Sequence, residues 1–412
     1  MKNQHSLKIA VIVGKFPTVS ETYIINQIGY LKQSGHKILI LCTRHIVKDY
    51  MANAAIDTNN LMDDVINFTW RELMPLIKYH RLFKILKILI KSIGSSSFKE
   101  LVKSLNVFKY KGNAINGSQF FREYFKQYFV INNFDVVHIH FADNAVYLSN
   151  HLKNFKNRVV VTFHGYDAHN FNKSFYSELL KINNIQYTVN TKFTRQKILA
   201  LGFPESAITI LPVGLDTSFF RPTVKGQAGI NILFVGRLIE LKGSLIAINI
   251  IEELIKKGYL LIHLHIIGEG EDYEKCKKQI IDKKLNDFVS LHGHKSQEGI
   301  KEHMNISDIF LFPGIIDSMG RCEAQGLVVQ EAQAMQLPVF VSNIGGVKEG
   351  VLNEITGYVV KEKGINGFVE KLEYLINNPI TLKTMGEKGR RFVIDRYDNK
   401  VLGEKLLKIY RL

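Results

Sequence analysis

Residues 7–17 read LKIAVIVGKFP, a short apolar run that leads into a loop containing Gly14. A continuous apolar run, in which polar residues do not alternate with apolar ones, is typical of a strand buried on both faces. A helix is expected to follow from about Glu21. The pattern returns in residues 231–237, NILFVGR, where a second apolar run ends at a glycine. Both stretches predict a strand of a parallel sheet followed by a helix.

The same alternation extends outward through both halves of the chain. Further strands are expected in 37–42, 134–141, 158–163, 185–190 and 206–214, and then in 261–270, 288–293, 308–314 and 338–343. Residues 221–229, RPTVKGQAG, are polar and contain Gly and Pro, which is typical of a linker. The sequence therefore predicts an α/β protein with two Rossmann-like, doubly wound domains.

The expected domains are residues 1–222 and residues 229–395, and a helix in 396–412 is expected to pack back on the first domain. In such folds the ligand binds outside the carboxyl ends of the strands. The cleft across which the two domains face one another is therefore the expected active site.

The composition narrows the class of partner. The chain has 412 residues and a formal net charge of +16, which favours an anionic partner such as nucleic acid, a lipid headgroup or a phosphorylated substrate. No nucleic-acid-binding motif is present, so that partner ranks last. The three Cys form no pairs, and no apolar run is long enough to span a membrane, so we expect a cytoplasmic protein without disulfides.

Half of the excess positive charge lies in residues 71–112, which contain ten Lys and Arg but only two Glu. Within it, residues 78–93 have helical periodicity, with an apolar arc that includes Leu82, Phe83, Leu86 and Ile90. The cations expected on the other half are Arg81, Lys84, Lys87 and Lys91, together with Lys78. Such a helix either lies on an anionic membrane surface or packs on its own domain with a solvated basic face.

Two acids eight positions apart mark the expected ligand site. Glu323 and Glu331 flank Gly326 and an apolar segment that begins a helix. The free backbone N–H groups of Leu327 and Val328 at that helix start would stabilise a diphosphate. Glu331, about one turn further, would accept hydrogen bonds from a ribose diol. The alternative is that both acids only stabilise the helix dipole.

These residues resemble the donor-site signature of glycosyltransferase family 4, which consists of retaining enzymes of GT-B fold that use nucleotide-diphosphate sugars. Other matches follow in family order: VGRLIELKG (235–243), IIGEG (266–270), LHG (291–293) and VGLDTSFFRP (213–222). FPTVSETYIINQI (16–28) and TFHGYD (162–167) resemble a bacterial exopolysaccharide subgroup, the colanic-acid-type transferases. The resemblance spans about residues 7–395.

The resemblance implies roles on the donor side. Arg237 and Lys242 are the expected cations for the diphosphate, and Gly268 lies in a loop near the nucleotide. Glu323 would hold the hydroxyls of the sugar. Because no Asp-x-Asp metal site occurs and two cations with a helix start can stabilise a leaving diphosphate, we expect transfer without a metal or cofactor. The co-substrate is expected to be UDP- or GDP-linked.

The acceptor side is assigned to the first domain. The resemblance implies that His164 faces the donor sugar, where it bonds a hydroxyl or stabilises charge at the anomeric carbon through its carbonyl. Glu21, Asp167, His140 and Asp143 are the candidate acceptor contacts. Gly14 stands where many family members carry two glycines, so its donor contact depends on a loop of different shape.

The predicted function is that of a retaining hexosyltransferase in bacterial surface polysaccharide biosynthesis, in which the product is capsule, exopolysaccharide or lipopolysaccharide. The acceptor is expected to be a saccharide or a polyprenyl-diphosphate-linked saccharide at the inner face of the plasma membrane. Two alternatives stay open. One is a nucleotide-sugar epimerase on the same fold, and the other is a non-catalytic protein that binds anionic membrane or nucleic acid.

Overall fold

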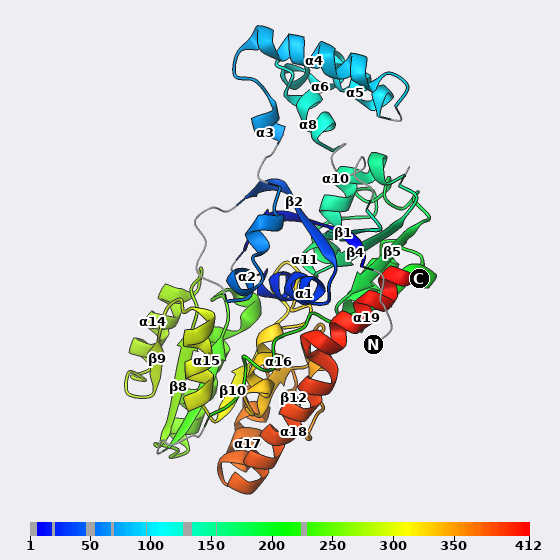
Figure 1. Cartoon of the computed structure of the whole chain (residues 1–412). Coiled ribbons are helices and arrows are strands. Elements are labelled where there is room, and N and C mark those ends of the chain that lie inside the picture. The colour runs from blue at the N-terminus through cyan, green and yellow to red at the C-terminus, as the bar shows by residue number, and fades with distance from the viewer. Residues whose placement is uncertain are drawn as a thin grey trace. The chain divides into compact units, whose positions relative to one another are not determined.

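The computed structural model describes residues 6–18, 21–46, 54–66, 70–95, 97–126, 134–153, 155–223 and 229–412. It divides into two compact units, each built on one sheet (Figure 1). The first unit is Met1–Val189, Lys197–Thr209 and Leu406–Leu412, and the second is Asn190–Gln196 and Ile210–Lys405. The expected domain limits at 222 and 229 stay predictions, and residues 224–228 of the expected linker lie outside the described residues.

The first sheet has six strands in the order β2-β1-β3-β4-β5-β6. The strands are β1 (Lys8–Phe16), β2 (Lys37–Ile46), β3 (Val136–His140), β4 (Arg158–Phe163), β5 (Ile185–Val189) and β6 (Ile208–Ile210). The strand pairs from β2 to β5 are parallel. The helices that accompany this sheet are α1 (Thr22–Gln33), α2 (Ala54–Thr58), α10 (Ala142–Leu152), α11 (Tyr166–His169) and α12 (Lys192–Ala200), with short 3-10 turns at Leu61–Asp64 and Glu205–Ala207.

The second sheet also has six strands, in the order β12-β11-β10-β7-β8-β9. They are β7 (Ile230–Val235), β8 (Ile262–Ile267), β9 (Val289–Leu291), β10 (Ile309–Phe312), β11 (Val339–Ser342) and β12 (Gly357–Val360), all in parallel pairs. The predicted doubly wound plan is confirmed in both units. The strand β12 was missed, because GYVV is short and follows a loop rather than a helix.

Helices and 3-10 turns connect the strands of the second sheet. The helices are α13 (Ser244–Lys256), α14 (Tyr273–Asp282), α15 (Gln297–Ile306), α16 (Leu327–Ala334), α17 (Ile365–Ile376) and α18 (Pro379–Tyr397), and the 3-10 turns are Glu240–Lys242 and Val347–Gly350. The strands are buried almost throughout, as in Phe310, Leu311 and Phe312 of β10. Burial on both faces explains why continuous apolar runs predicted these strands.

The last helix, α19 (Asn399–Arg411), begins in the second unit and ends in the first. Within the first unit, the Tyr410 hydroxyl lies 2.7 Å from Nδ1 of His138 on β3, and both side chains are buried. The C-terminal residues therefore pack directly against the first sheet.

The basic segment folds into short helices with a small core of their own. These helices are α3 (Trp70–Leu73), α4 (Lys78–Ser92), α5 (Phe98–Ser104), α6 (Val107–Tyr110), α7 (Gly112–Ile115) and α8 (Ser118–Lys126), and we call residues 70–126 the helical insertion. Its core is formed by Ile85, Ile88, Leu101, Phe120 and Phe121. Among the described residues, no helix has the length and apolar character needed to cross a bilayer.

Candidate active site

The switch point of the second sheet lies between β7 and β10, because the chain moves outward from β7 to β8 and β9 and then returns to β10 on the other side. Loops at such a point leave room for a ligand at the carboxyl ends of the strands. Arg237 and Lys242 follow β7, and Glu323 and α16 follow β10. The fold thus brings the expected donor residues to one edge of one sheet.

Lys242 and Glu323 form an ion pair at this edge, and each side chain is only about one-sixth exposed. Oε1 of Glu323 also accepts the backbone N–H of Gly326 at 3.1 Å. Burial alone would raise the pKa of Glu323, but Lys242 and the backbone donors outweigh it and hold this pKa below its ordinary value. Glu323 is therefore ionised and fixed against the start of α16.

The start of α16 offers unused donors. Gly326 adopts a left-handed conformation with φ of 76° and is the N-cap residue. Among the described residues, we find no acceptor for the backbone N–H groups of Leu327 and Val328. Two free amides and a helix dipole at one point favour an anion there.

Glu331 lies on the second turn of α16 and is partly buried. Burial raises the pKa of its carboxyl group to about 7, and no described residue forms a hydrogen bond or ion pair with it that offsets this cost. Its carboxylate is therefore ready to accept a hydrogen bond from a ligand hydroxyl, which would lower that pKa again.

Two further residues expected on the donor side, Arg237 and Gly268, lie in the loops after β7 and β8. Arg237 is exposed beside the end of β7. Gly268 has φ of 141°, and a Cβ atom there would lie 1.9 Å from the carbonyl oxygen of Gly236. Glycine is therefore required at 268 by the close approach of the loops after β7 and β8, whatever its part in donor binding.

In the first unit, His164 follows β4 and contacts several aromatic rings. Its Nε2 lies 3.0 Å from Nδ1 of His140, and its ring centroid lies 4.6 Å from Phe141 and 5.0 Å from Tyr23. Burial, together with the neighbouring His138, lowers the pKa of His164 to about 3. The imidazole is therefore neutral at pH 7 and does not act as a cation. Its Nε2 is taken by His140, and its Nδ1 is buried without a hydrogen-bond partner among the described residues.

His140 and Asp167 are buried behind His164. Asp167 accepts the backbone N–H groups of Ala142 at 2.8 Å, His164 at 2.9 Å and Gly165 at 3.1 Å. Burial nevertheless raises the pKa of Asp167 to about 7, since these N–H groups offset only part of the desolvation. Neither His140 nor Asp167 exposes more than 1% of its surface, so this geometry favours a positioning role over direct acceptor contact.

Glu21 and Asp143 lie on the same edge and share a cation. Arg44 forms an ion pair with Asp143 at 2.5 Å. Burial raises the pKa of Glu21 to about 7, while Thr18, Arg44 and Lys15 counteract that increase. A Cβ atom on Gly14 would make only ordinary contact with Arg44 at 3.7 Å, so none of the described neighbours requires glycine at 14.

Sequence reasoning missed several residues of this edge. Arg44 is the ion-pair partner of Asp143. Phe141 adopts φ of 64°, which is strained for a large side chain. His138 connects Tyr410 to Thr162, whose hydroxyl lies 2.6 Å from its Nε2. The sequence signal that could have pointed to His138 is the presence of two His in β3, which is otherwise apolar and buried.

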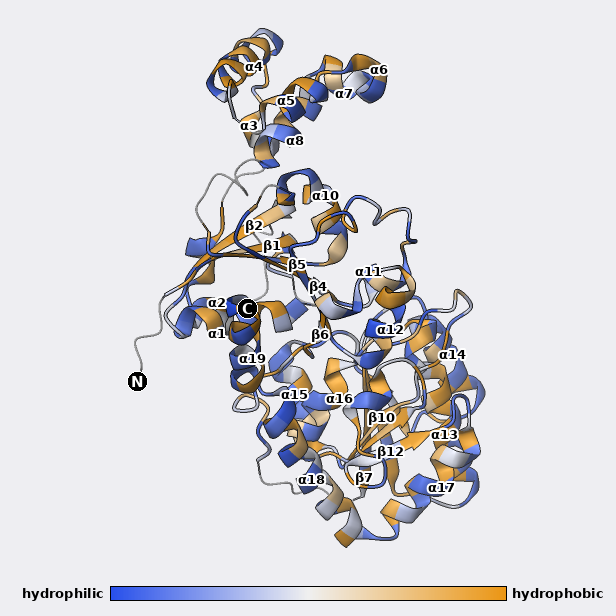
Figure 2. Cartoon of the chain, turned by 90° about the vertical axis from the view of Figure 1, so that its right-hand side faces the viewer, coloured by the Kyte–Doolittle hydropathy of each residue, from blue (hydrophilic) through white to orange (hydrophobic). Residues whose placement is uncertain are grey.

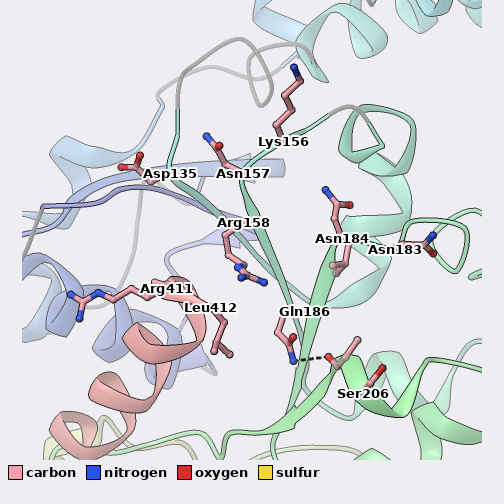
Figure 3. Close-up of a pocket in the computed structure, with 13 residues that line it drawn as sticks. Asp135, Lys156, Asn157, Arg158, Asn183, Asn184, Gln186, Ser206, Arg411 and Leu412 are labelled. Carbon is pink, nitrogen blue, oxygen red and sulfur yellow. Dashed lines mark hydrogen bonds between the residues drawn. The ribbon is translucent and has the colours of Figure 1, made fainter.

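One described cavity of about 660 Å³ lies at the opposite edge of the first sheet, at the amino ends of β3, β4 and β5 (Figure 3). Several of its polar side chains already have partners. Asn157 donates to the Phe134 carbonyl, Asn184 to the Phe155 carbonyl and Gln186 to the Ala207 carbonyl. These residues serve the fold, and none belongs to the predicted site. Nowhere in the described ranges do three or more His, Cys, Asp or Glu side chains gather in a geometry that could hold a metal ion.

Two family models match the chain. "Glycosyl transferases group 1" matches residues 217–392, and "Glycosyltransferase Family 4" matches residues 98–219. The amylovoran biosynthesis glycosyltransferase AmsK of Erwinia amylovora is 26% identical over 375 residues, which cover 86% of this chain and 87% of that relative. The putative colanic acid biosynthesis glycosyltransferase WcaL of Escherichia coli (strain K12) is 25% identical over 389 residues, or 89% of this chain and 90% of that relative.

Solved structures give the same fold. A glycosyltransferase from Rickettsia africae has a TM-score of 0.69 at 21% identity and covers 99% of this chain and 98% of its own. HepE from Anabaena, solved in complex with UDP, has a TM-score of 0.68 at 13% identity and covers 98% of both chains. The two six-stranded units are those of the GT-B fold, as predicted. With both halves matched in order, the chain belongs to the family 4 glycosyltransferases and is a transferase enzyme of bacterial polysaccharide biosynthesis.

Proposed function

We propose that this enzyme is a retaining glycosyltransferase that moves a hexose-type sugar from a UDP- or GDP-sugar to a saccharide or lipid-linked saccharide. The single observation that carries the donor assignment is the group at the start of α16. There an ion pair, two free backbone amides and an unpaired carboxyl meet at the switch point of one sheet.

The parts of that group match the parts of a nucleotide-diphosphate sugar. The amides of Leu327 and Val328 would bind the diphosphate, and the exposed Arg237 would add a bidentate contact. Glu331 would accept the ribose hydroxyls, and Glu323 would hold the sugar. Lys242 would reach the diphosphate from its place beside Glu323, sharing its charge between the two.

Names of similar proteins support the same reading. HepE is solved with UDP and with UDP-glucose, and the relatives are named for amylovoran and colanic acid biosynthesis. A nucleotide-sugar donor and a surface-polysaccharide acceptor agree with both.

In the transfer step, the bond from the anomeric carbon to the diphosphate oxygen breaks and a bond from that carbon to the acceptor oxygen forms. The acceptor attacks the face that the diphosphate leaves, so configuration is retained, and the leaving phosphate oxygen takes the hydroxyl proton. Arg237, Lys242 and the α16 amides stabilise the charge of the departing diphosphate without a metal. His164, being neutral, would bond a sugar hydroxyl or present its carbonyl to the anomeric carbon.

The acceptor is proposed to bind the first unit near Glu21 and Asp143, with His140 and Asp167 holding His164 in place. A polyprenyl-diphosphate-linked acceptor would bring the enzyme to the inner face of the membrane as a peripheral protein. The helical insertion, with its large basic excess, supports that location.

A screen of UDP- and GDP-sugars by thermal shift and donor hydrolysis tests the proposal. We expect one nucleotide to raise the melting temperature, and transfer to a saccharide acceptor to follow. A product whose anomeric centre is inverted on NMR would refute the retaining mechanism. Epimerised donor without transfer would identify an epimerase, and no response to any nucleotide would point to a non-catalytic protein.

Glu331→Ala tests the ribose contact separately. The variant should bind UDP or GDP about a hundredfold more weakly, as expected for loss of charged hydrogen bonds to the ribose. Turnover at low donor concentration that matched the wild type would refute this assignment.

A further inference from the structure

Helix α4 packs against the other helices of the helical insertion through the face that carries Arg81 and Lys84. Arg81 donates to the carbonyls of Pro75, Leu76 and Asn116, and Lys84 donates to the Leu73 carbonyl at 2.7 Å. Ile85 and Ile88 are buried on the same side. Both side chains bond backbone carbonyls within the insertion, so the expected membrane contact of Arg81 and Lys84 stays a prediction, and neither residue is used in the inference below.

The opposite face of α4 is apolar and unpartnered. Six side chains are between 51% and 71% exposed: Tyr79, Leu82, Phe83, Leu86, Ile90 and Ile93. At about 100° per residue they share one stripe of roughly 100°. In Figure 2, hydrophobic residues recur along the whole of α4. A helix that packs only on its own domain would bury this stripe.

Exposed lysines border the stripe. Lys78 lies on one margin, and Lys87 and Lys91 lie on the other, by the same angular spacing. Helix α4 contains no Asp or Glu. Apolar residues flanked by cations and free of acids suit a surface with hydrocarbon below and anionic groups around it.

We infer that the Tyr79–Ile93 stripe of α4 inserts into the headgroup region of an anionic phospholipid bilayer. Leu82, Phe83 and Leu86 enter the acyl boundary, while Lys78, Lys87 and Lys91 contact lipid phosphates. A second copy of the chain fits this face less well, since it would set these lysines against one another with no acid on either helix. The inference rests on the proposed function only in its reason for a membrane, which is where a lipid-linked acceptor would lie.

The test is flotation of the full-length protein with phosphatidylcholine vesicles, with and without phosphatidylglycerol. We expect binding to anionic vesicles that weakens with salt. Phe83→Ser with Leu86→Ser should reduce it about tenfold or more. The matched control is Leu260→Ser with Leu261→Ser, two exposed apolar residues of the second unit, and it should bind as the wild type does.

The contribution of the lysines is measured in the same way. Lys78, Lys87 and Lys91 changed together to Gln should weaken binding to anionic vesicles, whereas Lys361, Lys383 and Lys388 changed to Gln remove equal charge elsewhere and should not. The inference would be overturned if the wild-type protein failed to float with anionic vesicles. It would also be overturned if the F83S/L86S variant floated as well as the wild type. A dimer in solution that F83S/L86S converts to a monomer would overturn it as well.

Nucleotide binding on the same preparations separates this inference from the proposed function. If F83S/L86S loses vesicle binding but keeps its affinity for UDP or GDP, the result supports the membrane-binding face and shows that it is separate from the donor site. Vesicle binding without affinity for any nucleotide would keep the membrane face and refute the transferase mechanism.

Discussion

The ammonium group of Lys242 and the carboxylate of Glu323, which lie 81 positions apart in the chain, form an ion pair beside the start of α16. The pair joins the loop after β7 to the loop after β10, across the switch point of the second sheet. It fixes the charge balance of the proposed donor site before any ligand arrives.

Lys242→Met should leave the largely buried Glu323 without its counter-charge, at a cost of about 3 kcal/mol in unfolding free energy. Glu323→Gln should cost a similar amount, because it leaves the ammonium group unpaired. The double variant should cost much less than the sum, as for one shared interaction. Urea unfolding of the four proteins measures the coupling, and strictly additive losses would argue against the pair. Lys257→Met, in the more exposed pair with Glu373, is the control and should shift the midpoint little.

Glu331 should make stability depend on pH. Its pKa is about 7 in the folded protein against an ordinary value of 4.5, so between these pH values the folded state binds more protons than the unfolded state. The contribution of Glu331 to stability therefore falls as pH rises from 4.5 to 7, by up to roughly 3 kcal/mol. Glu331→Gln should remove only the part of this fall that Glu331 contributes, because the pKa values of Glu21 and Asp167 are also raised to about 7. Urea midpoints of the variant and the wild type from pH 4.5 to 8 measure the difference. Glu387→Gln on α18 removes the same charge and should leave the curve as it is.

Binding of the nucleotide should show the opposite trend. Ribose hydroxyls bond the ionised carboxylate best, so affinity for UDP or GDP should strengthen as pH rises through about 7. Calorimetric titration across this range is the measurement, and Glu331→Gln should flatten the dependence. A wild-type affinity that is constant with pH would contradict the ribose contact.

Asp167→Asn should loosen the loop that carries His164. Its amide can replace one carboxylate oxygen as an acceptor, but its NH2 group would face the N–H of Ala142 or of His164. We expect a loss of about 1–3 kcal/mol and a lower kcat. Asp135→Asn, which alters an exposed contact to the Lys8 N–H, is the control and should have a small effect on both. Full activity in D167N would show that the loop does not need the carboxylate.

Gly268→Ala and Gly14→Ala should differ sharply in stability, although both glycines were assigned to donor binding. At 268 a methyl group would collide with the Gly236 carbonyl, and φ of 141° is unfavourable for alanine. We expect a loss of about 3 kcal/mol or more at 268 and little change at 14. Melting temperatures of the two variants decide this, and equal values would contradict the described packing.

Arg81→Gln should loosen the helical insertion itself. The guanidinium donates to three carbonyls, and glutamine is too short to replace them. Amide exchange in residues 70–126 should rise about tenfold, while Lys87→Gln, on the exposed face, should leave it unchanged. Equal exchange in both variants would show that Arg81 does not anchor α4.

Much of the fold could be read from the sequence, because buried parallel strands are continuous apolar runs. β4 was predicted at the bounds that the structure gives it, and most other strands within a few residues. The strand β12 escaped, since four residues after a loop carry little periodic signal. For α4 the helix was predicted, but its buried face was not, because Ile85 and Ile88 make a second apolar side among the cations.

The sequence by itself determined the alternation of strands and helices, the basic excess of the helical insertion, and the residues at the carboxyl ends of the strands. These follow from local patterns of hydrophobicity and charge, which act over one or two turns or a single strand. Tertiary structure alone decided the partners: Lys242 with Glu323, His164 with His140, and Tyr410 with His138, which is 272 positions away. Such contacts depend on strand order and on which helix face the core accepts, and no local pattern encodes either.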